Sequence, residues 1–195
     1  MKIKLPIAMA IVFTLTTISG FSQNNKKFKS LDEAFVMPDS VFILDLSFAN
    51  LKELPKEINR FKNLEELDIS GNQISILPSE LFGLENLKFL RLGFQSCDGY
   101  VGNPITVLTE EILNLKKLTR LDLTGCSIEL LPEFLFKLEN LNGLNIAGTK
   151  VTSIPTAFFS KNYNGNFGLR IDSKQNFDKE TKKQLKEMSR GGYSK

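Results

Sequence analysis

A 23-residue period runs through most of this 195-residue chain. In each unit of the period, positions 1, 4, 6, 11, 14, 18 and 21 carry Val, Ile, Leu or Phe, and Lys161 is the one exception in 35 such positions. A composition that is 42% hydrophobic would fill only about 15 of them by chance. Since one unit cannot bury its apolar edge alone, the period predicts units stacked into a solenoid. The five units are 41–63, 64–86, 87–117, 118–140 and 141–163.

Each unit also carries signals for local structure. Positions 3 to 6 alternate between outward and inward side chains, which predicts a short strand. Position 9 is Asn72 in the second unit and Asn103 in the third, and such an amide can bond the backbone groups of a chain bend. Position 15 is proline in four units, which favours a fixed entry into a helical or irregular turn. We expect that turn to return residues such as Ile58 and Phe61 to the core.

The pattern L-x-x-L-x-L-x-x-N-x-L-x-x-L-P resembles the leucine-rich repeat family in its 23-residue form, and it covers 41–163. The resemblance implies an α/β solenoid with the shape of a horseshoe. It further implies a short parallel sheet on the concave face, helical or irregular turns on the convex face, and partners that bind the concave face. The chain departs from the pattern at position 9, which is Ala49, Cys126 or Thr149 in three units, and at Thr109, which replaces a proline.

Residues 1–22 have the three-part pattern of a secretory signal peptide. Lys2 and Lys4 precede an apolar run of about 14 residues, which is below the roughly 20 needed to span a bilayer. Small residues follow, so we expect cleavage after Ser22 and a secreted or periplasmic protein. No Asn-x-Ser/Thr acceptor occurs, and together with the signal pattern this favours a bacterial source. The remaining chain has no run long enough for a transmembrane segment.

Both ends of the solenoid carry segments that can cap it. In 23–40, the spacing of Ser30 and Glu33 predicts a short helix over 31–37, stopped by Pro38. In 164–195, the alternation of 167–171 predicts a sixth strand. A helix over 178–189 follows, with an apolar stripe and basic residues off that stripe. Those basic residues indicate a solvated face, with an anionic surface contact as the alternative. The stripe consists of Phe177, Thr181, Leu185 and Met188.

Composition excludes several kinds of function. The chain has no His, so it cannot hold a Ser-His-Asp, Cys-His or His-metal site. Two cysteines are too few for a structural zinc site. A net charge of +3, from 25 basic and 22 acidic residues, does not favour nucleic-acid binding. We therefore expect no enzyme, no metal and no cofactor.

The concave face is the first predicted binding surface, because strand positions 3 and 5 point out of it and position 2 lies at its rim. Exposed aromatic and Arg side chains are typical interface anchors. The alternative is that Asp68, Arg91 and Asp122 only neutralise one another across neighbouring strands. The candidate residues are Glu66, Asp68, Lys88, Phe89, Arg91, Arg120 and Asp122.

The insertion 93–102 in the third unit is the second predicted surface, since insertions in repeat proteins often bind. Its candidates are Phe94, Asp98 and Tyr100; the alternative is a tolerated surface loop. The insertion also contains Cys97, and Cys126 lies in the next unit. An exported protein meets an oxidising compartment, so either a disulfide or two independent thiols would fit the sequence.

Together these features predict an exported, non-catalytic module, expected to be monomeric, that binds a protein partner through the concave sheet and the insertion. Three alternatives stay open. They are a surface adhesin for host protein or glycan, a structural accessory subunit of an envelope complex, and an inhibitor of a secreted enzyme.

Overall fold

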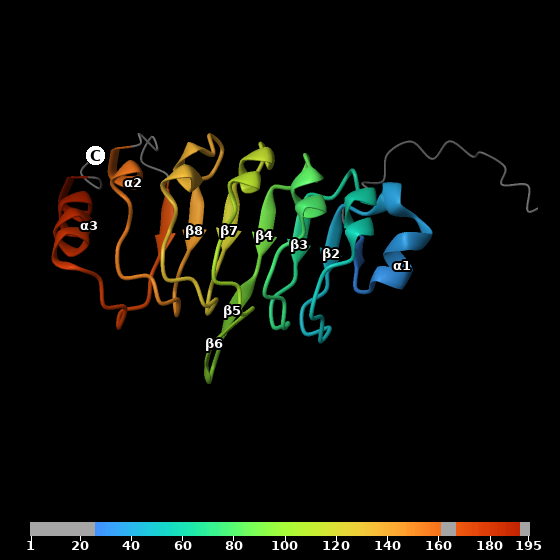
Figure 1. The fold of residues 1–195 in the computed structure, drawn as a ribbon, viewed down its shortest axis with the longest axis horizontal. Coiled ribbons are helices and arrows are strands. Elements are labelled where there is room, and N and C mark those ends of the chain that lie inside the picture. Colours follow the sequence, from blue (N-terminus) through green and yellow to red (C-terminus); the bar gives the residue numbers. More distant parts are fainter. Residues whose placement is uncertain (1–25, 161–166, 192–195) are drawn as a thin grey trace, which may run out of the picture.

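The computed structural model describes residues 26–160 and 167–191 as a curved, ladder-like solenoid (Figure 1). Seven short parallel strands form one sheet, and the strands follow one another in chain order. The predicted signal peptide 1–22 and Lys161 lie outside the described residues. The strands are β1 (Lys27–Phe28), β2 (Ile43–Asp45), β3 (Glu66–Asp68), β4 (Phe89–Arg91), β7 (Arg120–Asp122), β8 (Gly143–Asn145) and β9 (Gly168–Arg170).

The sheet register matches the repeat frame. Leu44 pairs with Leu67, and the same position pairs onward through Leu90, Leu121 and Leu144. Every position of the frame therefore forms a row that runs across the sheet, with neighbours about 4.8 Å apart. Residues at the same position of successive units therefore become neighbours in space, at a sequence separation of 23 for most strand pairs, 31 across the insertion and 25 between β8 and β9.

The apolar positions of the frame form the core. All of them in the described chain are buried except Leu51, which is partly buried and packs against the same cluster. The core is one continuous apolar ribbon between the sheet and the convex turns, as the stacking of the units requires.

Short 3-10 helices line the convex side, opposite the sheet (Figure 1). In three units a proline in extended conformation precedes the helix, and Thr109 takes this place in the third unit. Ile58 and Phe61 are fully buried, which confirms that the turn returns apolar side chains to the core. The helices are η3 (Lys56–Arg60), η4 (Ser79–Gly83), η5 (Glu110–Asn114) and η6 (Glu133–Lys137), and α2 (Thr156–Ser160) continues the row.

The asparagines at position 9 bond the backbone, as predicted. The Asn103 amide donates to the carbonyl oxygens of Ile69 and Leu92, at 2.8 and 2.7 Å, and accepts from the Ile74 N–H at 2.9 Å. Asn72 makes the same kind of bonds one unit earlier. Each side chain thereby ties two neighbouring units together.

The N-terminal end is covered by α1 (Leu31–Val36) and the short helix η2 (Pro38–Ser40). The Ser30 hydroxyl accepts from the Glu33 N–H at 3.2 Å, which confirms the predicted helix start. Phe35 of α1 stacks on Phe61 at 5.0 Å between ring centroids. Strand β1, with the buried Phe28, was not predicted and extends the sheet by one strand beyond the first unit.

The C-terminal end is covered by β9 and by α3 (Lys179–Gly191). Strand β9 lies within the predicted strand 167–171 and pairs with β8. Phe177 and Thr181 are buried, and the Thr181 hydroxyl accepts from the Ile154 N–H at 3.1 Å. Met188 is 42% exposed, so the predicted apolar stripe ends before it.

The insertion forms a β-hairpin of β5 (Gly93–Ser96) and β6 (Gly99–Gly102), which projects beyond the ends of the sheet strands (Figure 1). Gly102 lies against the backbone of Gly125 and Cys126, so close that a side chain there would collide with it. Cys126 is therefore at the base of the hairpin. Cys97 is at its tip, three residue pairs further along.

This geometry decides between the two alternatives for the cysteines: both are free thiols, and the disulfide between Cys97 and Cys126 is not formed. Three residue pairs span about 10 Å along a strand, whereas a disulfide needs Cα atoms within about 7 Å. Cys126 is buried, and its thiol lies 3.8 Å from the Leu92 carbonyl oxygen.

Candidate functional site

Two rows of side chains point out of the concave sheet, because residues 3 and 5 of each unit share a face of their strand. The row at position 3 contains Ile43, Glu66, Phe89, Arg120, Gly143 and Gly168. The row at position 5 contains Asp45, Asp68, Arg91, Asp122, Asn145 and Arg170. The structure therefore brings six of the predicted binding residues together on β3, β4 and β7.

Phe89 lies at the centre of this face, between two guanidinium groups. The Arg91 and Arg120 guanidinium carbons each lie 4.8 Å from the centroid of the Phe89 ring. Such cation–π contacts help to hold both guanidinium groups in place. The ring and the two cations form one preorganised group in the middle of the sheet.

The aspartates of the second row have a structural task. The Asp68 carboxylate accepts from the Ser70 N–H and hydroxyl, and the Asp122 carboxylate accepts in the same way from Thr124. Asp45 repeats this with Ser47. These bonds fix the turn that follows each strand, so Asp68 and Asp122 are committed to the fold as well as being on the candidate surface.

Ion pairs neutralise the N-terminal half of the face. The Arg91 and Asp68 side chains are 2.7 Å apart, and Lys88 at the rim is 2.8 Å from Glu65. Lys27 is 2.6 Å from Asp45. Partial burial would raise the pKa of Asp45, but hydrogen bonds from Lys27 and Ser47 outweigh it and hold the pKa below its ordinary value.

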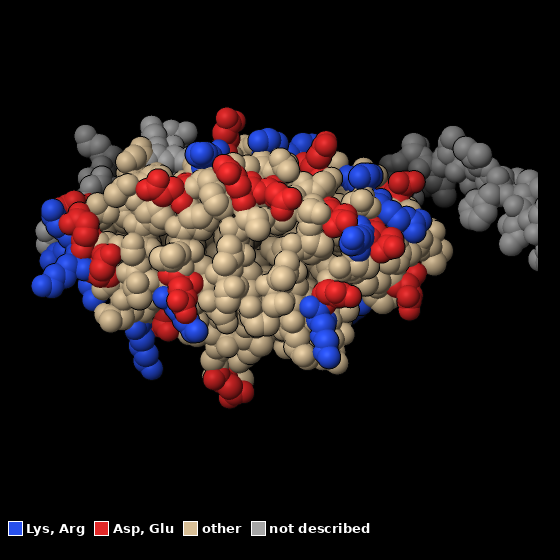
Figure 2. Space-filling model, in the orientation of Figure 1, with Lys and Arg blue, Asp and Glu red and all other residues tan. Residues whose placement is uncertain are grey.

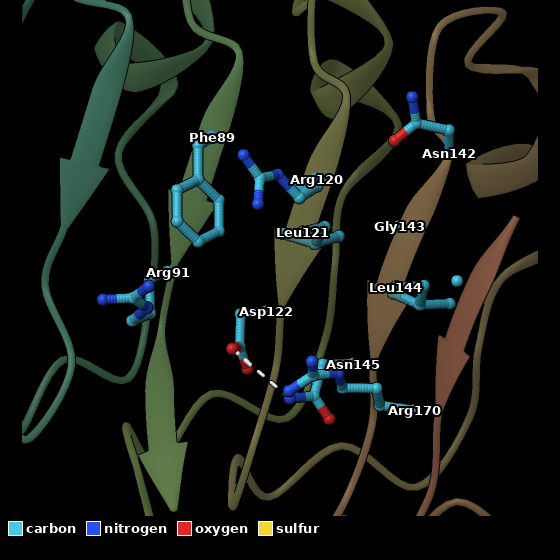
Figure 3. Close-up of a pocket in the computed structure, with 11 residues that line it drawn as sticks. Phe89, Arg91, Arg120, Leu121, Asp122, Asn142, Gly143, Leu144, Asn145 and Arg170 are labelled. Carbon is cyan, nitrogen blue, oxygen red and sulfur yellow. Dashed lines mark hydrogen bonds between the residues drawn. The ribbon is translucent and has the colours of Figure 1, made fainter. Parts of the chain in front are cut away.

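The C-terminal half of the face is hollowed into an open pocket of about 500 Å³ (Figure 3). Gly143 and Gly168 leave the position-3 row without side chains there. A Cβ on Gly143 would lie 2.8 Å from the Cγ of Arg120, so the glycine also gives room for that arginine. We call this hollow the arginine pocket; it is lined by Phe89, Arg91, Arg120, Leu121, Asp122, Asn142, Gly143, Leu144, Asn145, Gly168 and Arg170.

The arginine pocket carries uncompensated positive charge. Within the described part of the chain, neither Arg120 nor Arg170 has an acidic side chain within 4.0 Å. Asp122 is the one carboxylate that lines the pocket. One of its oxygens accepts from Thr124, and the other lies 3.4 Å from the Asn145 amide nitrogen (Figure 3).

The hairpin candidates lie at the edge of the sheet, apart from the concave rows. Phe94 packs edge-on against Phe48, with ring centroids 4.9 Å apart. The ring of Tyr100 lies over Gly148, where any Cβ would collide with it. Burial and the nearby Asp172 carboxylate, which accepts a hydrogen bond from the Tyr100 hydroxyl, raise the pKa of Tyr100. Both aromatic rings thus hold the hairpin against the row of turns beneath it.

Asp98, in contrast, is exposed at the tip of the hairpin beside Cys97. Figure 2 shows an acidic group at the bottom of the view, where the hairpin projects. Uncharged surface lies between this group and the charged edge at the top, which carries the short helices. Asp98 is therefore the predicted hairpin residue that is most open to a partner.

Positions 2 and 5 of the frame place Asn142 and Asn145 on the concave face, but the sequence did not reveal that they line one pocket with Arg170. Arg170 alternates with the partly buried Leu169 in the predicted strand 167–171, but it lies 25 residues after Asn145 and not 23, so only the pairing of β8 with β9 places it in the position-5 row. A second row was also missed at position 13, where Ile76, Val107 and Leu130 are 77%, 68% and 77% exposed in three consecutive units.

Two further observations concern the kind of site. In residues 26–160 and 167–191 no group of three or more Cys, Asp or Glu is placed to hold a metal ion. No helix in the same residues is long and apolar enough to cross a membrane. The described side chains on the concave face are suited to non-covalent binding, by charge, hydrogen bonding and aromatic contact.

Comparison with known families agrees with the stacked repeat units seen in the structure. The leucine rich repeat family matches residues 23–95, and a second family of the same description matches 117–138. Lumican from Gallus gallus is 32% identical over 119 residues, which are 60% of this chain and 32% of lumican. Vasorin from Mus musculus is 30% identical over 106 residues, which are 53% of this chain and 15% of vasorin. The chain thus spans about a third or less of the length of these relatives.

Solved structures show the same architecture. A leucine-rich repeat protein of Leptospira interrogans is 36% identical with a TM-score of 0.62, over 74% of this chain and 34% of that protein. Internalin C2 from Listeria monocytogenes has a TM-score of 0.57 at 24% identity, over 74% of this chain and 57% of that protein. The second likeness concerns the fold alone.

Proposed function

Because this chain is a leucine-rich repeat protein, a fold that generally serves protein interaction without catalysis, we propose that it is an exported module that binds a protein partner through its concave face. Repeat proteins of this kind present an extended concave surface that is rigid before the partner arrives. Preorganisation of that kind lowers the entropic cost of binding.

The observation that carries the proposal is the group formed by Phe89, Arg91 and Arg120. Aromatic and arginine side chains are the commonest energetic anchors of protein interfaces, and here they lie at the centre of the face. The open pocket beside them offers the concavity that such anchors accompany. The exposed hairpin tip with Asp98 would lie at the rim of the same interface.

Export is the second part of the proposal. It rests on the pattern of residues 1–22, with Lys2 and Lys4 before an apolar run that is too short to span a bilayer as a helix. The absence of Asn-x-Ser/Thr acceptors favours a bacterial envelope or medium as the destination.

Affinity capture from the native medium or envelope, with paired charge-swap variants as bait, tests the binding surface. The concave variant is Glu66→Arg with Lys88→Glu, and the matched convex variant is Lys56→Glu with Glu133→Lys. Both variants conserve net charge, and all four side chains are exposed. Neither variant touches the lining of the arginine pocket.

We expect the captured partner to be lost from the concave bait and retained by the convex bait. Retention by the concave bait together with loss from the convex bait would contradict the proposal and move the binding surface to the short helices. Circular dichroism of both baits checks that each is folded.

A further inference from the structure

On the concave face, the large side chains of the position-3 row end at β7, and glycines follow from β8 onward. Position 3 carries Phe89 and Arg120 on β4 and β7, and then glycine on β8 and β9. The floor of the arginine pocket is therefore bare backbone, which includes that of Leu121 and Leu144, whose side chains are buried in the core on the other face of the sheet. A Cβ at Gly168 would meet only the Asn142 carbonyl oxygen at 3.9 Å, so this part of the floor is open space.

Two cations flank that open floor. Arg120 on β7 and Arg170 on β9 are separated by strand β8 and by two positions along the strand direction, so their Cα atoms lie about 12 Å apart. Of the other charges in the pocket, Arg91 pairs with Asp68, whereas Asp122 keeps its negative charge and is held by hydrogen bonds from Thr124 and Asn145. The net positive charge of the pocket therefore comes from Arg120 and Arg170, which together outweigh Asp122.

We propose that the arginine pocket binds an acidic, extended peptide segment of the partner, with Arg120 and Arg170 each receiving a carboxylate. This rests on the proposed function and names the chemistry of its ligand. Guanidinium groups match carboxylates in planar, two-bond geometry. In an extended peptide, alternate side chains point the same way about 7 Å apart, which long arginine side chains on strands two apart can reach.

Other features of the pocket favour a peptide over a carbohydrate. The Phe89 ring already carries two guanidinium groups, so it is not free to stack on a sugar ring. The exposed Asn142 lies beside the glycine floor and has both a donor and an acceptor for a peptide backbone. The bare floor itself lets a backbone approach the sheet closely.

Fluorescence anisotropy with short labelled peptides tests the proposal on the purified protein. The probe is a peptide of alternating Glu and Ser, and its analogue has Gln in place of Glu. The protein variants are Arg120→Gln with Arg170→Gln, and the matched control Lys56→Gln with Lys137→Gln, which removes the same charge from the convex side. Gly168→Leu fills the pocket without changing any charge.

We expect the Glu peptide to bind and the Gln analogue to bind at least about tenfold more weakly. The Arg120/Arg170 variant and Gly168→Leu should each weaken the Glu peptide at least about tenfold, while the convex control stays within about twofold. Added salt should weaken binding to the wild type.

Equal binding of the Glu peptide to the wild type and to the Arg120/Arg170 variant would overturn the proposal. So would an absence of peptide binding, or binding of a sulfated heparin fragment that the same variant abolishes while the Glu peptide does not bind. In any of these cases the proposed function would still stand if the captured partner is lost from the Glu66/Lys88 bait. Retention of the partner by that bait, together with its loss from the convex bait, would instead contradict both the proposed function and the proposed peptide ligand.

Discussion

One repeat position shows how single residues stabilise the ladder. At position 9, Asn72 bonds four backbone groups and Asn103 three, whereas the side chains of Cys126 and Thr149 bond fewer backbone groups. The Gln175 amide donates to the Thr149 hydroxyl and to the Val151 carbonyl oxygen, at 3.2 and 3.0 Å. The C-terminal cap thus supplies the amide that the last unit lacks.

Replacing Asn103 with Ala should lower the free energy of unfolding by about 2–4 kcal/mol, because it leaves buried backbone groups without partners. Asn142→Ala is the matched control, since its exposed side chain should change stability by no more than about 0.5 kcal/mol. Urea denaturation followed by circular dichroism measures both. Equal, small effects of the two substitutions would show that position 9 does not stabilise the ladder.

The two thiols should differ sharply in reactivity. Burial raises the pKa of the Cys126 thiol to about 12, so at pH 8 almost none of it is in the reactive thiolate form. Cys97 is exposed at the hairpin tip. A thiol reagent should therefore label one cysteine per native chain and two after unfolding without reductant. Labelling of neither cysteine in the unfolded, unreduced chain would indicate the disulfide that the geometry excludes.

At the scale of elements, the hairpin β5–β6 is an addition to an intact repeat. Without Phe94–Val101, the third unit would have 23 residues, with Gly102 at position 8 and Asn103 at position 9. Position 8 is a glycine with φ between +67° and +70° in the second, fourth and fifth units, a conformation that glycine adopts readily. Phe48 occupies it in the first unit with φ +55°.

Deleting Phe94–Val101 should leave a folded, cooperative protein. The expected loss of stability is about 1–2 kcal/mol, mainly from the aromatic contacts of Phe94 and Tyr100. Thermal unfolding followed by circular dichroism measures this loss. A broad, non-cooperative transition would mean that the hairpin is needed to close the third unit.

The elements also show what a sequence can and cannot reveal. The period predicted the strands and turns of every unit, because each apolar position recurs and any other register would expose the core. Strand β1 was missed because two residues carry no alternation. The pairing of the hairpin was missed because Gly93, Gly99 and Gly102 leave few side chains to form a pattern. The turn role of Asp68 and Asp122 was readable from the Ser or Thr two residues later, and was not recognised.

At the scale of the whole molecule, stacking of the units brings residues from the same position of successive units together on one surface. Residues 120, 143 and 168 become neighbours only because the register is constant, so the arginine pocket has no signature in any one unit. The frame could predict which residues share a row. It could not predict that the methylene stem of Arg120 lies against Gly143 or that Phe89 holds two guanidinium groups, since those contacts depend on side-chain packing across strands.

Export concerns the whole chain as well. Protein isolated from the native envelope or medium should begin within a few residues of Gln23, as N-terminal sequencing would show. An intact Met1 on protein found in the cytosol would contradict export. Replacing Lys2 and Lys4 with Glu should reduce the exported fraction, because a signal peptide needs its positive start.

Site-specific photo-cross-linking identifies the face of the solenoid that the partner contacts. A photoreactive side chain is placed at Glu66 or Asn142 on the concave face, and at Lys56 or Glu133 on the convex side as matched positions. On illumination the photoreactive side chain bonds covalently only to groups in direct contact with it. The positions that form cross-links therefore identify the residues that the partner contacts. If the concave face binds the partner, we expect cross-links from Glu66 and Asn142 and none from Lys56 and Glu133. Cross-links from the convex positions alone would contradict binding by the concave face.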